Sequence, residues 1–219
     1  MTIYVINPNS SEHVTDGIDD AIAPMRQISP VPISCLTLKE GPAGIETQAH
    51  VDGVVGPLLK LASGLQEDAS AFVVACFSDP GLAALREAQT VPVLGIAESA
   101  YLQAMMLGQR FGILSLGRAS IQRHIRYLGA LGVRDRLAAD LPLGLGVLDL
   151  ADADRTVARL AEVGGTLRDQ FGADVLITGC AGMAQYRTLL EEKTGLPVVD
   201  PCQAATAAAI GQLALRTCG

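Results

Sequence analysis

Short apolar runs alternate along the whole chain with longer segments in which apolar and polar residues are mixed. The short runs are rich in Val and Ile, which favour strands, and the longer segments are rich in Ala, Leu and Arg, which favour helices. Strands that are apolar throughout are typical of parallel sheets covered by helices on both faces. The pattern predicts strands at 2–7, 31–38, 70–76, 91–96, 111–116, 145–150, 174–180 and 196–200.

The segments between these strands have the composition of helices. They predict helices at 10–23, 47–64, 80–89, 97–108, 118–131, 152–171, 183–194 and 201–216. Pro57 lies inside the second of these, and because proline removes a helical hydrogen bond we expect a kink or break there. Strand and helix alternate from end to end, so the fold class is α/β with parallel sheets.

The two halves of the chain repeat one plan. The stretch "AFVVACFSDPGLAALREAQTVPVLGIAESA" has a counterpart in "DVLITGCAGMAQYRTLLEEKTGLPVVDPCQAATAA", in which an apolar strand again ends in cysteine and a later Pro-Val strand leads into a small-residue helix. Asn7 and Ser115 are 108 residues apart, and Cys76 and Cys180 are 104 apart. This near-constant offset indicates a duplication.

The duplication predicts two similar Rossmann-like or flavodoxin-like domains related by a pseudo-two-fold axis. We expect the first at 1–96 together with the C-terminal helix at about 201–219, and the second at 97–200. Ligands of open parallel sheets bind outside the carboxyl ends of the strands, so the active site is expected in the cleft between the two domains.

Composition and charge exclude several classes of partner. The chain has 219 residues, 49% of them hydrophobic, enough for one substantial core or two small ones. Its net charge of −7 is spread along the chain without a basic stripe, and aromatic residues are only 4%, which argues against a nucleic-acid partner. No apolar run reaches the roughly 18–20 residues that span a membrane. The N-terminus lacks the basic region of a signal peptide, so we expect a cytoplasmic location.

Cysteine, histidine and lysine usage argues against a bound metal or cofactor. Five cysteines are an odd number, contain no Cys-x-x-Cys pair, and accompany only three histidines. Only three lysines occur, and none follows a strand end where a pyridoxal phosphate pocket would need one. We therefore expect neither a metal site nor a cofactor.

Cys76 and Cys180 differ from the other cysteines by their place in the repeat. A single cysteine is usually a small buried apolar residue, which is the interpretation for Cys35 and Cys218, and Cys202 is only a weak candidate. Cys76 and Cys180 instead recur at equivalent strand ends ahead of a helix, whose N-terminus favours a thiolate. Asp79, the expected N-cap before Pro80, carries a negative charge that opposes this effect.

Two cysteines on opposite sides of one carbon predict a specific reaction. One thiolate removes a proton from a stereocentre beside a carbonyl, and the opposing thiol returns a proton to the other face. The enolate between these steps needs hydrogen-bond donors, for which the backbone N–H groups after each cysteine are candidates. These donors belong to Phe77, Ser78, Ala181 and Gly182, and Gly179 with Gly182 would let the backbone approach a ligand closely.

Two further polar segments admit a structural or a binding role. "NPNSS" at 7–11 is either a turn with a helix cap from Asn9 or Ser10, or part of a ligand site. "GPAGIETQ" at 41–48 carries Glu46, which is either a first-turn helix charge or a site residue.

Five motifs in order resemble the hydantoin racemase family of the Asp/Glu racemase superfamily, which includes allantoin racemases. They are "INPNSS", "GIE" at 44–46, "ACFSDPGL" at 75–82, "GIAESA" at 95–100 and "GCAGM" at 179–183. The resemblance implies a duplicated two-domain α/β fold, homo-oligomers, and cofactor-independent racemisation with Cys76 and Cys180 as the two bases. The substrate-binding residues expected with it are Asn9, Glu46, Phe77, Ser78, Ser115, Leu116, Gly179, Ala181 and Gly182.

The residues after the cysteines bear on the substrate. Glutamate and aspartate racemases of the superfamily usually have Asn-Thr after the first cysteine and a Thr-led turn after the second, whereas this chain has Phe77-Ser78 and Ala181-Gly182. No arginine adjoins either motif to pair with a carboxylate. A small neutral ring, a 5-substituted hydantoin or allantoin, is therefore the favoured substrate class.

Departures from the family pattern leave other functions open. The chain has "ILSLGR" where hydantoin racemases commonly show consecutive threonines, and Ile45-Glu46-Thr47 where many read Ile-Glu-Gly. The alternatives are an Asp/Glu-type amino-acid racemase and a maleate isomerase-like enzyme whose thiolate adds to its substrate. A non-enzymatic module that binds a small molecule, with both cysteines as packing, is the third.

Overall fold

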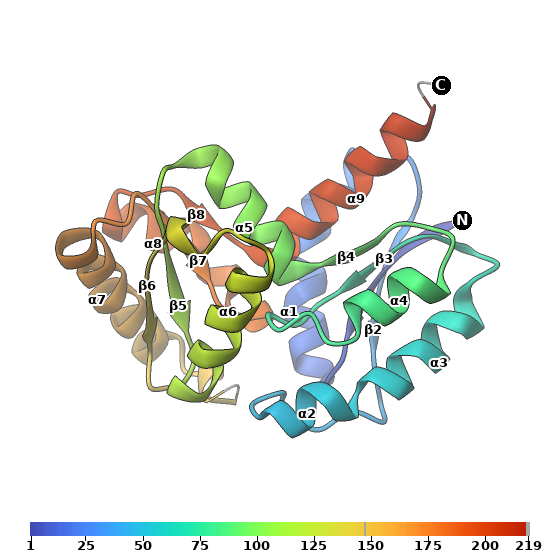
Figure 1. Cartoon of the computed structure of the whole chain (residues 1–219), viewed down its shortest axis with the longest axis horizontal. Helices are drawn as coiled ribbons and strands as arrows, with labels where there is room; N and C mark the ends of the chain where they lie inside the picture. The colour runs from blue at the N-terminus through green and yellow to red at the C-terminus, as the bar shows by residue number, and fades with distance from the viewer. Residues whose placement is uncertain (147, 218–219) are drawn as a thin grey trace. The chain divides into compact units, whose positions relative to one another are not determined.

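The structure is a computed structural model that describes residues 1–146 and 148–217, and the chain forms two compact units (Figure 1). Unit 1 comprises Met1–Ser99 and Cys202–Gly219, and unit 2 comprises Ala100–Pro201. Each unit contains a four-stranded sheet in which every described pairing is parallel. The predicted α/β class is confirmed.

Unit 1 is built on a sheet with the strand order β2-β1-β3-β4. Its strands are β1 (Thr2–Asn7), β2 (Ile33–Thr37), β3 (Ala69–Val74) and β4 (Val93–Gly95). Its helices are α1 (Glu12–Ile22), η1 (Ala23–Gln27), α2 (Gln48–Gly53), α3 (Val55–Leu65) and α4 (Leu82–Ala88), together with α9 (Pro201–Thr217) from Cys202 onward.

The two faces of this sheet are covered by different helices. Ile6, Phe72 and Val74 pack with residues of α3 and α4 in one core, as the alternation of side chains along a strand requires. α9 lies against α1, where the Gln203 side chain donates a hydrogen bond to the Ala21 carbonyl. Helices therefore cover both faces of the sheet, and β2 at its edge is partly exposed.

Unit 2 has a sheet with the strand order β6-β5-β7-β8. Its strands are β5 (Phe111–Ser115), β6 (Leu137–Pro142), β7 (Val175–Thr178) and β8 (Val198–Val199). Its helical elements are α5 (Ile96–Leu107) from Ala100 onward, α6 (Arg118–Ala130), η2 (Arg134–Arg136), η3 (Leu148–Ala151), α7 (Ala153–Phe171), η4 (Ala181–Tyr186) and α8 (Arg187–Thr194).

The same hydrogen bonds recur at equivalent points of the two sheets. The Ala75 N–H donates to the Ile6 carbonyl at 2.8 Å, and the Gly179 N–H donates to the Leu114 carbonyl at 2.9 Å. One residue further along, Leu38 donates to the Asn7 carbonyl, and Leu143 donates to that of Ser115. These matches place Cys76 and Cys180, which follow Ala75 and Gly179, at equivalent positions.

The strand predicted at 145–150 is wrong. The strand that pairs with β5 at this edge of the sheet is β6, residues 148–151 form η3, and Val147 lies outside the described residues. The apolar residues Leu143, Leu145 and Leu150 belong to the core of unit 2 without being in a strand. β6 escaped prediction because Asp140 interrupts its apolar pattern, although this side chain is buried.

Two predicted helices also differ in detail. The helix expected at 47–64 is divided at Val54 into α2 and α3, and Pro57 lies in the first turn of α3, where a missing N–H costs no helical bond. The helix expected at 80–89 begins only at Leu82, with Gly81 as its N-cap in the left-handed region at φ 68°. Asp79 is therefore not the N-cap of α4, and that expectation is wrong.

Candidate active site

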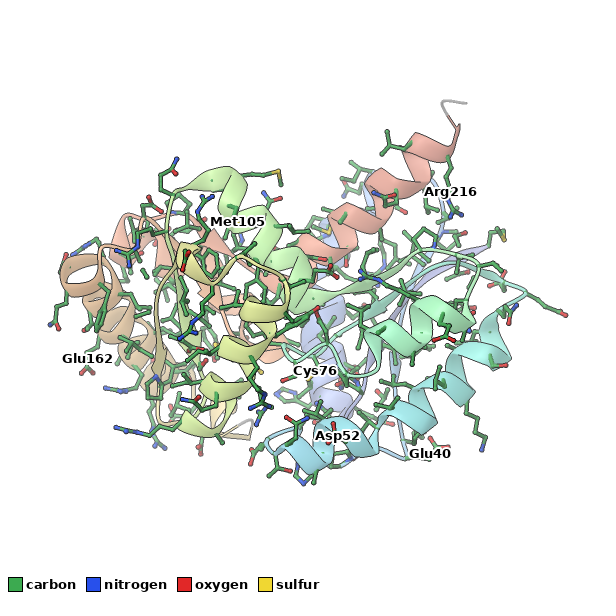
Figure 2. The ribbon with its side chains drawn as sticks, in the orientation of Figure 1. Glu40, Asp52, Cys76, Met105, Glu162 and Arg216 are labelled. Atoms are coloured by element: carbon green, nitrogen blue, oxygen red, sulfur yellow. The ribbon has the colours of Figure 1, made fainter. Side chains whose placement is uncertain are left out.

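Cys76 lies in the turn that follows β3 (Figure 2). Its side chain is half-buried, its N–H donates to the Val74 carbonyl at 3.1 Å, and its carbonyl accepts from the Asp79 N–H at 2.9 Å. Because α4 starts six residues later, at Leu82, Cys76 does not stand at a helix N-terminus. The expected assistance of that helix to a Cys76 thiolate is wrong.

Cys180 lies at the equivalent point after β7 and directly precedes η4. It is also half-buried, and its carbonyl accepts from the Met183 N–H at 3.2 Å. Both cysteines thus open a turn closed by a hydrogen bond from the residue three positions on.

The turns after the cysteines expose backbone donors. Within residues 1–146 and 148–217, the N–H groups of Ser78, Ala181 and Gly182 donate to no protein acceptor. Phe77 and Ala181 are buried, whereas Ser78 and Gly182 are half-buried. An anionic oxygen beside either cysteine could therefore accept hydrogen bonds from the backbone.

Asp79 connects the Cys76 turn to the start of α5. Its Oδ1 accepts from the Ala97 N–H and its Oδ2 from the Glu98 N–H, both at 2.9 Å, and the residue is only 7% exposed. It is the one non-glycine residue of the described chain with a positive φ, at 42°. Asp79 thus caps α5 instead of the helix that follows it in sequence.

The loop after β1 holds Asn9 in a network of hydrogen bonds. Asn7 Nδ2 donates to Asn9 Oδ1 at 3.0 Å and to Thr15 Oγ1 at 3.0 Å, and the Ser11 N–H donates to Asn9 Oδ1 at 2.9 Å. The Asn9 Nδ2 group donates to no other group in the described part of the chain. The loop therefore fixes the Asn9 amide and leaves its donor available for a ligand.

Glu46 lies in a loop that packs beside the Asn9 loop. The Ser10 N–H donates to the Pro42 carbonyl at 2.9 Å, and a Cβ on Gly41 would lie 2.3 Å from the Pro8 carbonyl oxygen. Glu46 is exposed, its N–H donates to His50 Nδ1 at 3.3 Å, and the next residue, Thr47, caps α2. The structure thus brings the Asn9 and Glu46 loops together.

Ser115 at the end of β5 belongs to a buried polar cluster that the sequence did not suggest. Its Oγ donates to Asp140 Oδ1 at 2.5 Å and lies 3.2 Å from His124 Nδ1, which is 2.7 Å from Asp140 Oδ2. Ser115 is fully buried, whereas the neighbouring Leu116 is half-buried. His124 and Asp140 gave no signal because one lies within a helix and the other interrupts the pattern of a strand.

Gly179 and Gly182 are required for different reasons. A Cβ on Gly179 would lie 2.7 Å from the Leu114 carbonyl oxygen, so a glycine at this position allows the backbone after β7 to lie close to β5. A Cβ on Gly182 would lie 3.0 Å from Leu150 Cδ1 and 3.9 Å from Cys180 Sγ. Gly182 therefore lies near the Cys180 sulfur.

Two of the remaining cysteines, Cys35 and Cys202, are placed as packing residues. Burial, with a smaller effect of Asp19, raises the pKa of the Cys35 thiol to about 12. Cys202 is fully buried in α9, and Cys218 lies outside the described residues. All the other predicted site residues lie at or after the carboxyl ends of strands in their own unit.

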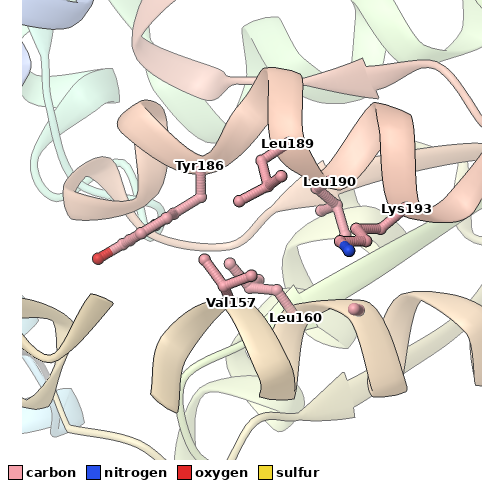
Figure 3. A pocket seen from close by; sticks show the side chains of 7 residues that line it. Val157, Leu160, Tyr186, Leu189, Leu190 and Lys193 are labelled. Atoms are coloured by element: carbon pink, nitrogen blue, oxygen red, sulfur yellow. The ribbon is translucent and has the colours of Figure 1, made fainter. Parts of the chain in front are cut away.

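Other kinds of site find little support in the described residues. No group of three or more His, Cys, Asp or Glu side chains in them could hold a metal ion, and none of their helices has the length and apolarity to cross a membrane. A shallow depression between α7 and α8 contains none of the predicted site residues (Figure 3). Its lining consists of Val157, Leu160, Ala161, Tyr186, Leu189, Leu190 and Lys193.

The fold and these positions define a class: a duplicated α/β protein with a cysteine after the third strand in sequence of each sheet. The sequence profile of the Asp/Glu/Hydantoin racemase family matches residues 3–209. The chain therefore belongs to this family, and it is an isomerase.

Individual relatives agree with this assignment. The chain is 34% identical over 204 residues to the hydantoin racemase of Pseudomonas sp. (strain NS671), covering 91% of this chain and 81% of the relative. It is 32% identical over 219 residues to the hydantoin racemase of Paenarthrobacter aurescens, covering 98% and 92%. The crystal structure of allantoin racemase from Pseudomonas fluorescens superposes with a TM-score of 0.93 at 25% identity, covering 99% of this chain and 92% of that one.

Proposed function

We propose that the protein racemises a carbon acid beside a carbonyl without a cofactor, with Cys76 and Cys180 as the two bases. The observation that carries the proposal is the equivalence of the two cysteines. Each follows the third strand of its sheet in chain order, which pairs with the first, and each opens a turn closed by a hydrogen bond from the residue three positions on. A packing cysteine has no reason to recur in this way in both halves of a duplicated chain.

The proposed reaction begins with one cysteine as thiolate and the other as thiol. The thiolate takes the proton from the stereocentre, and the electron pair of the broken C–H bond passes to the neighbouring carbonyl to give a planar enolate. The thiol on the opposite face then gives its proton to the same carbon and becomes the thiolate. No atom is gained or lost, and the enzyme ends with its two protonation states exchanged.

Backbone donors suit the enolate intermediate. The N–H groups of Ser78, Ala181 and Gly182 have no acceptor in the described part of the chain and lie beside the cysteines. The fixed Asn9 amide offers a further donor from the end of β1. Neutral donors stabilise a developing negative charge when they are held in place before reaction.

The proposed substrate is a 5-substituted hydantoin or allantoin. Both are small rings that carry a carbonyl next to the stereocentre and further carbonyls for N–H donors. The support is the neutral character of Phe77, Ser78, Ala181 and Gly182, together with the names of the hydantoin and allantoin racemases that the chain resembles.

A substrate panel in deuterated water tests this proposal. Enantiopure 5-substituted hydantoins, allantoin, aspartate and glutamate are incubated with the protein, and optical rotation and C–H exchange are followed together. We expect loss of rotation with deuterium incorporation for a cyclic ureide and neither for the amino acids. Exchange only into aspartate or glutamate would support the amino-acid racemase alternative, and absence of exchange with every substrate would refute the two-base proposal.

A further inference from the structure

Asp79 occupies a space that only a glycine in β4 leaves open. A Cβ on Gly95 would lie 2.2 Å from both Cγ and Oδ2 of Asp79. The carboxylate fills this space and accepts the N–H groups of Ala97 and Glu98. The Cys76 turn is therefore joined through Asp79 to the end of β4 and the start of α5.

Unit 2 has no carboxylate at the position of Asp79. The residue that closes the Cys180 turn, as Asp79 closes the Cys76 turn, is the buried Met183. The two units therefore differ in the residue that closes the cysteine turn, which is acidic in unit 1 and apolar in unit 2.

In unit 2 a buried carboxylate stands instead at the end of the neighbouring strand β8. Phe72 pairs with Val93 in unit 1, and the equivalent Leu176 pairs with Val198 in unit 2. Two residues after these partners stand Gly95 and Asp200, and Asp200 is 2% exposed immediately before α9. Asp200 thus carries a side chain at the position where unit 1 has Gly95, which has none.

We propose that Asp79 and Asp200 are equivalent positioning residues, one for each cysteine, supplied from the turn in unit 1 and from the strand end in unit 2. Asp79 joins the Cys76 turn to the start of α5 through the Ala97 and Glu98 N–H groups, and the proposal assigns the same part to Asp200, which immediately precedes α9. In the proposal, each carboxylate places a negative charge near the sulfur of its cysteine. The role in catalysis rests on the proposed function, whereas the effect on each cysteine can be measured without it.

The test compares the reaction of each cysteine with iodoacetamide, followed by mass spectrometry of the Cys76 and Cys180 peptides. In Asp79→Asn the turn loses an acceptor and the negative charge that disfavours a thiolate. We expect Cys76 to be alkylated at least fivefold faster than in wild type and Cys180 to change less than twofold. Asp200→Asn is expected to give the reverse selectivity.

Asp174 provides a matched control. It also accepts two successive N–H groups, from Gln109 and Arg110, both at 3.0 Å, and it also faces a glycine, Gly108, whose Cβ would lie 2.3 Å from its Oδ1. It precedes β7 and so lies at the opposite end of the strands from Cys180. Asp174→Asn should leave both alkylation rates within twofold of wild type.

A charge-relocation variant tests the equivalence directly. Asp79→Gly accepts the positive φ and frees the space in front of Gly95, so it should accelerate Cys76 alkylation as Asp79→Asn does. Adding Gly95→Asp rebuilds in unit 1 the arrangement of unit 2, and it should return the rate to within twofold of wild type. Circular dichroism confirms that each variant is folded.

Steady-state kinetics on a substrate found in the panel links positioning to catalysis. Asp79→Asn and Asp200→Asn are expected to lower kcat at least tenfold with KM changed less than threefold, and the relocation variant should recover kcat. Equal acceleration of both cysteines, an effect of Asp174→Asn of the same size, or failure of the folded relocation variant to slow alkylation would overturn the proposal. Selective alkylation without racemisation of any substrate would instead overturn the proposed function and leave the positioning role supported.

Discussion

At the scale of single residues, the described cysteines differ in their surroundings although all belong to one chemical type. Cys76 and Cys180 are half-buried at strand ends, Cys202 is fully buried, and Cys35 is held as a neutral thiol by its environment. The sequence alone separates them only through the repeat, because burial and neighbouring charge depend on residues distant in the chain, such as Asp19 beside Cys35.

Cys35 predicts part of the dependence of stability on alkaline pH. Its pKa is raised from 9.0 to about 12, so the native state holds this proton more tightly than the unfolded chain. The resulting stabilisation is complete below a pH of about 9 and is lost as the pH rises toward about 12. Urea unfolding of wild type and Cys35→Ala at pH about 7.5 and about 10.5 measures it. The variant should lose less stability than wild type between the two values, and equal losses would contradict the assignment.

At the scale of elements, apolar periodicity predicted most strands and helices but misplaced those that depend on buried polar groups. β6 was missed because Asp140 is buried by pairing with Ser115 and His124, residues of β5 and α6. The N-cap role of Asp79 was misassigned because its partners, Ala97 and Glu98, lie 18 and 19 residues away. A short-range sequence pattern does not predict hydrogen bonds between residues that lie far apart in the chain.

The polar clusters at the ends of β1 and β5 are equivalent but chemically different. In unit 1, Asn7 Nδ2 donates a hydrogen bond to Thr15 Oγ1, which lies 2.6 Å from Thr37 Oγ1. In unit 2, the Ser115 hydroxyl is hydrogen-bonded to His124 and Asp140. Each cluster joins one strand, β1 or β5, to the helix that follows it, α1 or α6, and to the adjacent edge strand, β2 or β6. The carboxyl end of the strand beside each cysteine strand is fixed in this way.

Removal of the His124 side chain should therefore weaken the attachment of the edge strand β6 and lower the stability of the protein. In His124→Ala the buried Asp140 carboxylate loses one of its partners, and we expect the free energy of unfolding to fall by about 1–3 kcal/mol. Thr15→Val, in the neutral cluster of unit 1, is the matched comparison and should cost about 0.5–1.5 kcal/mol. Chemical denaturation measures both, and a His124→Ala protein as stable as wild type would show that the cluster does not hold β6.

At the scale of the whole molecule, each unit contains a helix that follows the fourth strand of the other. α5 starts in unit 1 and continues in unit 2 from Ala100, and α9 belongs to unit 1 from Cys202 onward. The duplication could be predicted from the sequence, because the cysteine motifs recur at a regular spacing. The exact residues at which α5 and α9 pass from one unit to the other depend on contacts in the folded chain, which a local sequence pattern does not contain.

This exchange of helices predicts an unequal response to truncation. A chain ending at Asp200 lacks α9 and exposes the surface of unit 1 that buries Cys202, Ala205 and Ala209. Hydrogen exchange should then show loss of amide protection in β1 and β3 with protection in β5 and β7 retained. Equal loss in both sheets, or protection unchanged in β1, would contradict this division of the chain.

The most direct test of the central claim is the stereochemistry of exchange in Cys76→Ser and Cys180→Ser. Each enantiomer of a substrate racemised by the wild-type protein is incubated with each variant in deuterated water, and deuterium at the stereocentre is followed together with optical rotation. Two-base catalysis predicts that both variants lose racemisation, and that each exchanges the proton of only one enantiomer, opposite for the two variants. Continued racemisation by either variant, or exchange of the same enantiomer by both, would contradict the account.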